Sequence, residues 1–171
     1  MHFIGVWDKI IPMVRQIIKS GQVSENRKAR FAYSIDDTIE AGVSLTGAEI
    51  KSVRYGLVTI VDGFVQRRGD NLVLAGVEIQ KLPTAARIVN FDERRPRQLL
   101  LHRSQINRMV GKLQEKGATI VPLKLYFKNS LVKVEVALVK GKRDYDKKET
   151  LLKKDAERDL QRTLKEISNR K

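Results

Sequence analysis

The sequence TIVPLKLYFKNSLVKVEVALVKGK, residues 119–142, holds two apolar runs on either side of Lys128-Asn129-Ser130. Apolar runs of strand length that flank a short polar break are typical of a β-hairpin. In the second run Lys133 and Glu135 alternate with valines, which indicates a strand with one face in solvent. The stretch therefore predicts an antiparallel hairpin with one polar face.

The first run of this hairpin has a polar face of its own. Side chains of a strand alternate between two faces, so Lys124, Tyr126 and Lys128 share one of them. One of the two adjacent aromatic residues must then face inward, and we expect Phe127 to be that residue. Packing in the core and at its rim is the alternative interpretation of both rings.

Two more strands are predicted nearer the N-terminus. FAYSI, residues 31–35, alternates large and small side chains with the two-residue period of a half-buried strand. Asp36-Asp37 is a turn signal, and TIEAGVSL, residues 38–45, predicts the next strand. Gly42 inside that strand indicates a bulge or a close backbone approach.

Two helices are predicted from their end signals and apolar spacing. In TGAEIKSVRYG, residues 46–56, Thr46 and Glu49 have the spacing of a capping box. In SQINRMVGKLQEKG, residues 104–117, apolar side chains recur at helical spacing, and Ser104 is the expected N-cap.

Two further segments, VTIVDGFVQRR and NLVLAGVEI, predict a second hairpin, and QLLLH predicts a short strand or a helix entry. About six short antiparallel strands with two or three helices predict a closed or partly closed barrel.

The chain divides into three parts. We expect residues 1–23 to form a variable, flexible N-terminal extension and residues 24–139 to form the barrel. Residues 140–171 are a charged tail with a thin apolar stripe at helical spacing. The stripe consists of Leu152, Ala156, Leu160, Leu164 and Ile167. Such a helix is marginal in isolation, so we expect the tail to gain order by binding a partner.

Charge is the most informative property of the composition. The chain has 34 Lys and Arg against 20 Asp and Glu, a formal net charge of +14. A chain this basic attracts polyanions, because each neutralised phosphate releases a condensed counterion. Nucleic acid and an anionic membrane are the two candidates, and the size of the excess favours nucleic acid. No apolar run approaches the roughly 20 residues that span a bilayer, and we expect no membrane partner.

The sequence contains no recognisable catalytic motif. Glycine-rich nucleotide-binding patterns, HExxH and GxSxG are absent. The absence of cysteine excludes disulfides, and His2 and His102 lack the spacing of metal ligands. A metal-dependent nuclease is the enzymatic alternative, but the acids lie in turns or beside Lys and Arg. We therefore expect no enzyme activity, no catalytic residue, no metal site and no cofactor.

Cations interleaved with aromatic residues favour nucleic-acid binding. RKAR, residues 27–30, precedes two aromatic residues, and Lys133 lies across the hairpin from the face of Lys124, Tyr126 and Lys128. Small barrels of the oligonucleotide-binding (OB) type hold nucleic acid through phosphate contacts and base stacking. A solvated charged face is the alternative interpretation of the lysines. The pattern also leaves open a generic ribosomal or single-strand-binding OB protein.

Five segments, in this order, resemble the small protein B family, also called the SsrA-binding protein family. They are NRKARFAY, EAGVSLTGAEIKSVR, RPRQLLLHRSQIN, TIVPLKLYFKNSLVKVEVALVKGK and YDKKET. The resemblance covers residues 24–171, and several long motifs in one order make it specific. It implies a mainly β fold with α: an OB-fold-like antiparallel β-barrel with about three surrounding helices and a C-terminal basic tail.

The resemblance further implies a bacterial, cytoplasmic, monomeric RNA-binding protein that is not an enzyme. Members of that family bind the tRNA-like domain of transfer-messenger RNA and deliver this RNA to ribosomes stalled on truncated messages, a process called trans-translation. Their second partner is the ribosome, at the decoding region of the small subunit and in the mRNA channel. The tail is disordered when free and becomes helical on the ribosome.

The resemblance also implies which residues contact RNA. Asn26, Glu40 and Leu100 stand at positions that the family uses for its RNA-binding surface. The same motifs and the strand pattern add Arg27, Lys28, Arg30, Glu49, Lys51, Ser52, Lys124, Tyr126, Lys128 and Lys133. The charge argument does not explain Glu40, which could accept hydrogen bonds from base or ribose donors or orient an arginine.

The junction KGKRDYDKKE, residues 140–149, matches the point where the family's tail meets ribosomal RNA near the decoding centre. The expected ribosome contacts are Lys140, Gly141, Lys142, Arg143, Tyr145, Asp146, Lys147 and Lys148. Many members have histidine where Tyr145 stands. Stacking on a base survives that exchange, whereas a role for a protonatable imidazole does not. A generic solvated charge run is the alternative interpretation.

Overall fold

Strands β8 (Ala118–Lys128) and β9 (Leu131–Gly141) form the hairpin that the sequence predicted. The computed structural model describes residues 17–82 and 91–142 of the chain. The hairpin turns through Asn129 and Ser130, whose φ angles are 50° and 64°. Two consecutive residues with positive φ form the tight turn that matches the right-handed twist of the flanking strands.

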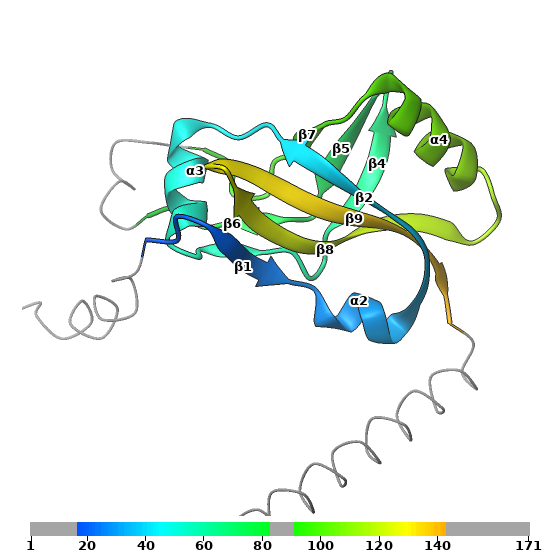
Figure 1. Ribbon diagram of the computed structural model, residues 1–171, viewed down its shortest axis with the longest axis horizontal. Helices are drawn as coiled ribbons and strands as arrows, with labels where there is room; N and C mark the ends of the chain where they lie inside the picture. Colours follow the sequence, from blue (N-terminus) through cyan, green and yellow to red (C-terminus); the bar gives the residue numbers. More distant parts are fainter. Residues whose placement is uncertain (1–16, 83–90, 143–171) are drawn as a thin grey trace, which may run out of the picture.

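This hairpin closes a barrel (Figure 1). The sheet order is β1-β8-β4-β5-β7-β2-β9, and an additional β8–β9 pairing joins β9 back to β8. Every pair is antiparallel. The other strands are β1 (Gly21–Glu25), β2 (Tyr33–Val43), β4 (Phe64–Arg68), β5 (Asn71–Ala75) and β7 (Arg97–Leu100). A separate two-stranded sheet pairs β3 (Val58–Thr59) with β6 (Glu78–Ile79). The expected mainly β barrel is confirmed, although β2, β8 and β9 are longer than the short strands predicted.

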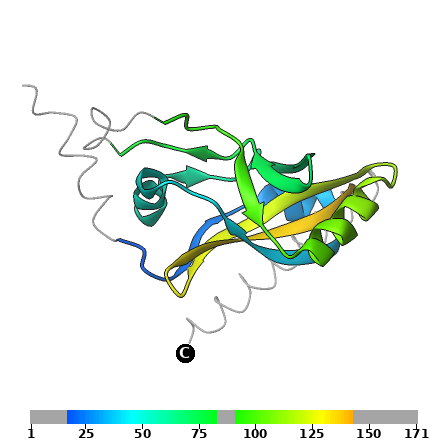
Figure 2. The ribbon, with the colours of Figure 1, turned by 90° about the horizontal axis from the view of Figure 1, so that it is seen from above.

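Three helices surround the barrel within the described residues: α2 (Arg27–Ala32), α3 (Gly47–Arg54) and α4 (Arg103–Leu113). Figures 1 and 2 show α3 beside the turn of the β8–β9 hairpin and α4 toward the hairpin's open end. Helix α2 packs on the outside of the hairpin, where Ala29 joins a small apolar cluster that includes Val121 and Ala137. The end of β9 is therefore covered on both faces, which is why Val136 to Val139 are all buried.

The core fills the barrel with alternate side chains of its strands. Leu125, Phe127, Val134 and Val136 point inward and are at most 3% exposed, and Met109 of α4 is fully buried against them. The inward orientation expected of Phe127 is confirmed. Because strand side chains alternate, the intervening residues of β8 and β9 face outward and supply a polar surface.

The segment before β2 differs from the prediction. Residues 27–32 form helix α2 instead of the start of a strand, because Asn26 caps the helix by accepting a hydrogen bond from the Ala29 backbone N–H at 3.0 Å. The turn predicted at Asp36-Asp37 is wrong, because β2 runs through it with an irregular register between Ile35 and Asp37. Such a bulge bends the strand without ending it.

The two predicted helices are present, with one cap corrected. The capping box of α3 is confirmed: the Thr46 N–H donates to Glu49 Oε2 at 2.7 Å, and the Glu49 N–H donates to Thr46 Oγ1 at 3.4 Å. Helix α4 begins one residue before the expected cap Ser104, with His102 as its N-cap. The His102 N–H donates to Gln105 Oε1 at 3.0 Å, so Gln105 supplies the capping contact.

The barrel extends slightly beyond the boundaries expected at residues 23/24 and 139/140, because β1 begins at Gly21 and β9 ends at Gly141. The division of the chain into an extension, a barrel and a tail stays a prediction. Within residues 17–82 and 91–142, no helix is long and apolar enough to cross a membrane.

Candidate nucleic-acid interface

A row of outward-facing residues crosses four neighbouring strands. Tyr126 of β8 pairs with Lys133 of β9, Lys133 pairs with Gly42 of β2, and Gly42 pairs with Leu100 of β7. Paired residues on adjacent strands share one face of a sheet. The register therefore brings the aromatic ring and the cation of one hairpin and the apolar side chain of the distant strand β7 into one continuous strip.

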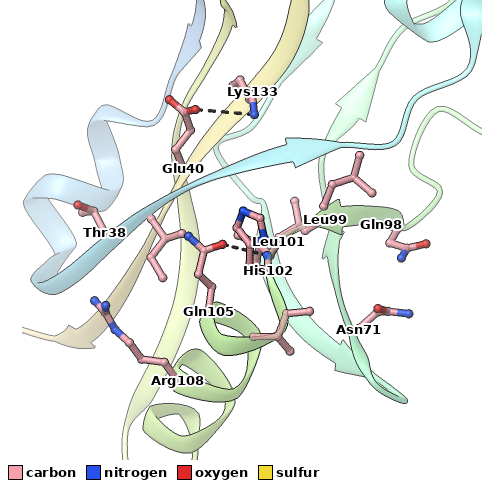
Figure 3. A pocket seen from close by; sticks show the side chains of 13 residues that line it. Thr38, Glu40, Asn71, Gln98, Leu99, Leu101, His102, Gln105, Arg108 and Lys133 are labelled. Carbon is pink, nitrogen blue, oxygen red and sulfur yellow. Dashed lines mark hydrogen bonds and ion pairs between the residues drawn. The ribbon is translucent and has the colours of Figure 1, made fainter.

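Glu40 of β2 binds the polar groups of this strip. The Tyr126 hydroxyl donates to Glu40 Oε2 at 2.6 Å, and Lys128 Nζ donates to the same oxygen at 3.0 Å. Lys133 Nζ lies 3.8 Å from Glu40 Oε1 (Figure 3). One carboxylate thus fixes a phenol and two ammonium groups, which explains an acid at the centre of a basic surface. We call Leu100, Glu40, Tyr126, Lys128 and Lys133 the Glu40 strip.

The charges of the Glu40 strip shift the ionisation of its members. Burial and the hydrogen bond to Glu40 raise the pKa of Tyr126 to about 12. Hydrogen bonds from Tyr126 and Lys128 hold the pKa of Glu40 below its ordinary value. At neutral pH, Tyr126 is therefore a hydroxyl donor and Glu40 a carboxylate, so the arrangement is fully formed under cellular conditions.

Leu100 gives the strip an exposed apolar end. Leu100 is 55% exposed, so its apolar side chain lies open to solvent beside the polar groups of the strip. A Cβ atom added at Gly42 would meet the Cβ of Leu100 at 3.2 Å. Glycine therefore lets the side chain of Leu100 lie against β2. The close contact at Gly42 is with this side chain and not with a backbone, and the irregular register of β2 lies between Ile35 and Asp37.

Helix α2 carries a second set of cations. Arg27, Lys28 and Arg30 are exposed on it, and Arg27 Nε lies 3.3 Å from the carboxylate of Glu25. Asn26 itself is only 3% exposed. Its side chain caps α2 through Oδ1 and donates from Nδ2 to the carbonyl of Val61 at 3.0 Å. Asn26 therefore fixes the start of the helix that carries these cations.

Two expected contact residues of α3 lie in the interior. Glu49 and Ser52 are 0% exposed, so direct contact with RNA does not fit their positions, while Lys51 on the same helix is exposed. Glu49 Oε1 accepts from Arg97 Nε at 2.9 Å, and Glu49 Oε2 accepts from Arg95 at 2.6 Å. Burial alone would raise the pKa of Glu49, but hydrogen bonds from Arg95, the Thr46 backbone and Arg97 outweigh it and hold that pKa below its ordinary value.

The buried arginine Arg97 was not predicted from the sequence. It is 0% exposed and also donates to the carbonyls of Val77 and Glu93 at 2.7 and 2.9 Å. A basic residue in a basic chain carries no local sign of burial, and Arg97 lies just before the segment QLLLH that was predicted as a short strand or a helix entry.

The start of the predicted tail is tied to the barrel. Lys140 Nζ lies 2.7 Å from Glu115 and 3.7 Å from Asp36, and the Lys142 N–H donates to the carbonyl of Ala32 at 3.1 Å. Gly141 is the last residue of β9. The other expected tail contacts lie outside the described residues: Arg143, Tyr145, Asp146, Lys147 and Lys148.

Several acids of the barrel lie beside cations. Asp37 is paired with Arg108 and Lys112 of α4, and Lys124 is flanked by Glu25 and Glu135 in the register of β1 and β9. In the part of the chain that the structure describes, no three His, Cys, Asp or Glu side chains gather as a metal site would require. The described surface can therefore offer cations, an aromatic ring and hydrogen-bonding groups to a polyanion.

Comparison with known proteins gives one consistent result. The family model "SmpB protein" matches residues 23–166. An SsrA-binding protein of Gloeothece citriformis is 45% identical over 153 residues, which cover 90% of this chain and 99% of that protein. An SsrA-binding protein of Chloroflexus aurantiacus is 48% identical over 145 residues, covering 85% of this chain and 91% of its own.

A solved structure agrees with these relatives. A chain from "tmRNA-SmpB: a journey to the center of the bacterial ribosome" aligns with a TM-score of 0.61 and 39% identity. The alignment covers 78% of this chain and 94% of the other. The barrel described above is thus similar to one that has been studied with tmRNA on the ribosome.

Proposed function

The chain belongs to the SmpB protein family, and we propose that it binds the tRNA-like domain of transfer-messenger RNA and brings this RNA to stalled ribosomes for trans-translation. The proposal rests most directly on the Glu40 strip, where one carboxylate holds Tyr126, Lys128 and Lys133 on the outer face of the barrel. The net charge of +14 supports a polyanionic partner.

In this proposal each member of the strip has a distinct task. Lys128 and Lys133 contact phosphates, Tyr126 presents its ring for stacking, and Leu100 covers an apolar part of a ribose or base. Glu40 orders these groups before RNA arrives, so less side-chain entropy is lost on binding. The exposed cations Lys51, Arg27, Lys28 and Arg30 and the half-buried Lys124 widen the basic surface.

The buried candidates act through positioning. Asn26 holds helix α2 at its first turn and against the loop at Val61. Glu49 joins the start of α3 to Arg95 and Arg97 on the segment that leads into β7, and β7 ends with Leu100. Ser52 packs in the same interior. Changes at these residues would alter RNA binding through the shape of the barrel.

We assign the contacts with the ribosome to the C-terminal part of the chain. Lys140, Gly141 and Lys142 lead out of β9 beside α2 and the end of α4, and the cations of residues 143–148 follow in the sequence. The decoding region of the small subunit and the mRNA channel are the proposed partners, since both are lined by RNA phosphate. A bacterial cytoplasmic location and a purely binding role, without catalysis, belong to the same proposal.

Fluorescence anisotropy with labelled RNA tests the proposal. Wild-type protein should bind a transcript of the tRNA-like domain more tightly than poly-U, and the log–log salt slope should be several units. Lys128→Ala and Lys133→Ala should weaken binding and each lower the slope by about 1. Equal affinity for poly-U would favour a generic single-strand-binding protein instead.

The same samples test the enzymatic alternative. Labelled RNA incubated with the protein and Mg²⁺ should stay intact over hours. Cleavage that disappears when carboxylates such as Asp62 and Asp92 are replaced by Asn would support a metal-dependent nuclease and contradict the proposal.

A further inference from the structure

A groove with a volume of about 780 Å³ runs beside the Glu40 strip (Figure 3). Strand β2 forms one wall, β7 and the turn after it form the other, and the first two turns of α4 close one end. Its volume lies in the range of small-molecule sites. Glu40, Leu100 and Lys133 belong both to the strip and to the groove.

The groove combines an apolar floor with a polar rim. Ile39, Leu99 and Ile106 line it and are at most 7% exposed. The rim carries side chains that both donate and accept hydrogen bonds: Thr38, Asn71, Gln98, His102 and Gln105. A flat heteroaromatic ring with polar edges matches this combination, because its faces need apolar or aromatic contact and its edges need hydrogen bonds.

Gln105 and His102 lie together at the centre of the groove (Figure 3). The Oε1 atom of Gln105 accepts the backbone N–H of His102 at 3.0 Å, which orients the Gln105 amide and leaves its NH₂ group as a donor. His102 is exposed at the start of α4, and Figure 3 shows it beside Gln105 among the lining residues. An imidazole ring at this place can stack on a base.

We infer that this groove receives one unstacked nucleobase of the RNA, whose phosphate is held at Lys133. The inference rests on the proposed function and adds a contact that reads the edge of a base to the phosphate, stacking and apolar contacts proposed for the strip. Glu40 at the groove edge can accept a hydrogen bond from an exocyclic amino group or a ribose hydroxyl, while the Gln105 amide donates to a base acceptor.

A double-mutant cycle between protein and RNA tests the inference. An abasic scan of the transcribed tRNA-like domain should find one position whose missing base weakens wild-type binding about tenfold. His102→Ala should weaken binding of the intact RNA about tenfold as well, and the two losses should not add, since each removes the same contact. His102→Phe, which keeps a flat ring, should retain most of the affinity.

The salt dependence of the affinity distinguishes this contact from the phosphate contacts. Stacking releases no counterions, so His102→Ala should lower affinity without changing the salt slope, whereas Lys133→Ala lowers the slope by about 1. Asn107→Ala is the matched control, because Asn107 lies on the same helix but lines a different groove. It should bind like the wild type.

The outcomes decide between the two proposals. Failure of the wild type to prefer the tRNA-like domain would overturn the proposed function and the inference with it. Two results, both with normal wild-type binding, would overturn the inference alone. In the first, His102→Ala binds the intact RNA like the wild type. In the second, no abasic RNA removes the difference in affinity between His102→Ala and the wild type. If His102→Ala fails to fold, NMR of the wild-type protein still tests the inference. The amide resonances of Leu99, Leu101 and Gln105 should shift when the intact RNA is added and should not shift with the abasic RNA.

Discussion

Glu40 accepts hydrogen bonds from one tyrosine and one lysine and lies close to a second lysine, all on strands far from it in the sequence. An isolated acid on a basic surface would weaken the attraction of RNA. Here it fixes the direction of groups that would otherwise sample many rotamers, because lysine side chains lose the most entropy when they are ordered. At the residue scale, Glu40 therefore contributes by holding these side chains in one geometry.

Replacing Glu40 by Gln should lower the pKa of Tyr126 from about 12 toward its ordinary value of 10. Part of the shift should remain, because burial of the phenol contributes first and is unchanged. Titration of the tyrosine ¹³Cζ resonances measures this pKa, with Tyr126→Phe to assign the signal. An unchanged pKa would show that the hydrogen bond to Glu40 is not formed in solution.

Glu49 is the residue on which we expect stability to depend most strongly. Glu49→Gln should lower the free energy of unfolding by about 3–5 kcal/mol, because it leaves the fully buried Arg97 without its charge partner. Glu78→Gln is a matched control, since it breaks a pair with the exposed Arg94 and should lower the free energy of unfolding far less. Urea unfolding at pH 7 measures both, and equal costs would contradict the assignment.

The pH dependence of stability gives a second test of Glu49. Its pKa in the folded protein lies below the ordinary 4.5, so the unfolded chain takes up this proton first as the pH falls. The stabilisation by Glu49 is therefore complete above about pH 4.5 and is lost as the pH falls further, through the folded pKa. Glu49→Gln should flatten the stability curve in that acid range, and an unchanged curve would contradict the shift.

At the scale of elements, the sequence predicted the features that depend on residues close together in the chain. The β8–β9 hairpin, the β4–β5 hairpin and the capping box of α3 all depend on residues only a few positions apart. Helix α2 was missed because FAYSI has strand periodicity, and because its cap Asn26 is secured by the distant carbonyl of Val61. The bulge of β2 was taken for a turn because two adjacent aspartates are typical of turns.

The β8–β9 turn offers a test at this scale. Ser130 has a φ of 64°, a conformation that glycine adopts without the steric cost of a Cβ atom. Ser130→Gly should stabilise the protein by up to about 1 kcal/mol, measured as a higher urea midpoint. Gly69→Ala in the β4–β5 turn, where φ is 59°, should shift the midpoint in the opposite direction. A lower midpoint for Ser130→Gly would show that the serine side chain stabilises the turn.

At the scale of the molecule, the barrel and the tail meet within a few residues. Strand β9 continues to Gly141, and Lys140 and Lys142 are bonded to other parts of the barrel. A cut at residue 139 would therefore remove contacts of the folded part together with the tail. A cut after Lys142 keeps these contacts.

Truncation after Lys142 should leave both the unfolding midpoint and the affinity for the tRNA-like domain at wild-type values. The same variant should fail to support tagging of stalled peptides in a reconstituted translation system, because we assign the ribosome contacts to the tail. Truncation after Val139 should also lower the midpoint, because it removes the Lys140 ion pairs and the Lys142 backbone hydrogen bond. Full tagging without the tail would contradict the division of labour.

The sequence by itself determined most of the local elements, the outward face of β8, the excess of positive charge and the family resemblance. Each of these is carried by neighbouring residues or by sums over the chain, so no knowledge of the fold is needed. Only the tertiary structure decided the strand register, and with it the meeting of Glu40 with Tyr126, 86 positions away. The same holds for the burial of Glu49 against Arg97 and for the groove beside Leu100. Such contacts depend on barrel closure, because closure brings strands together regardless of their separation along the chain.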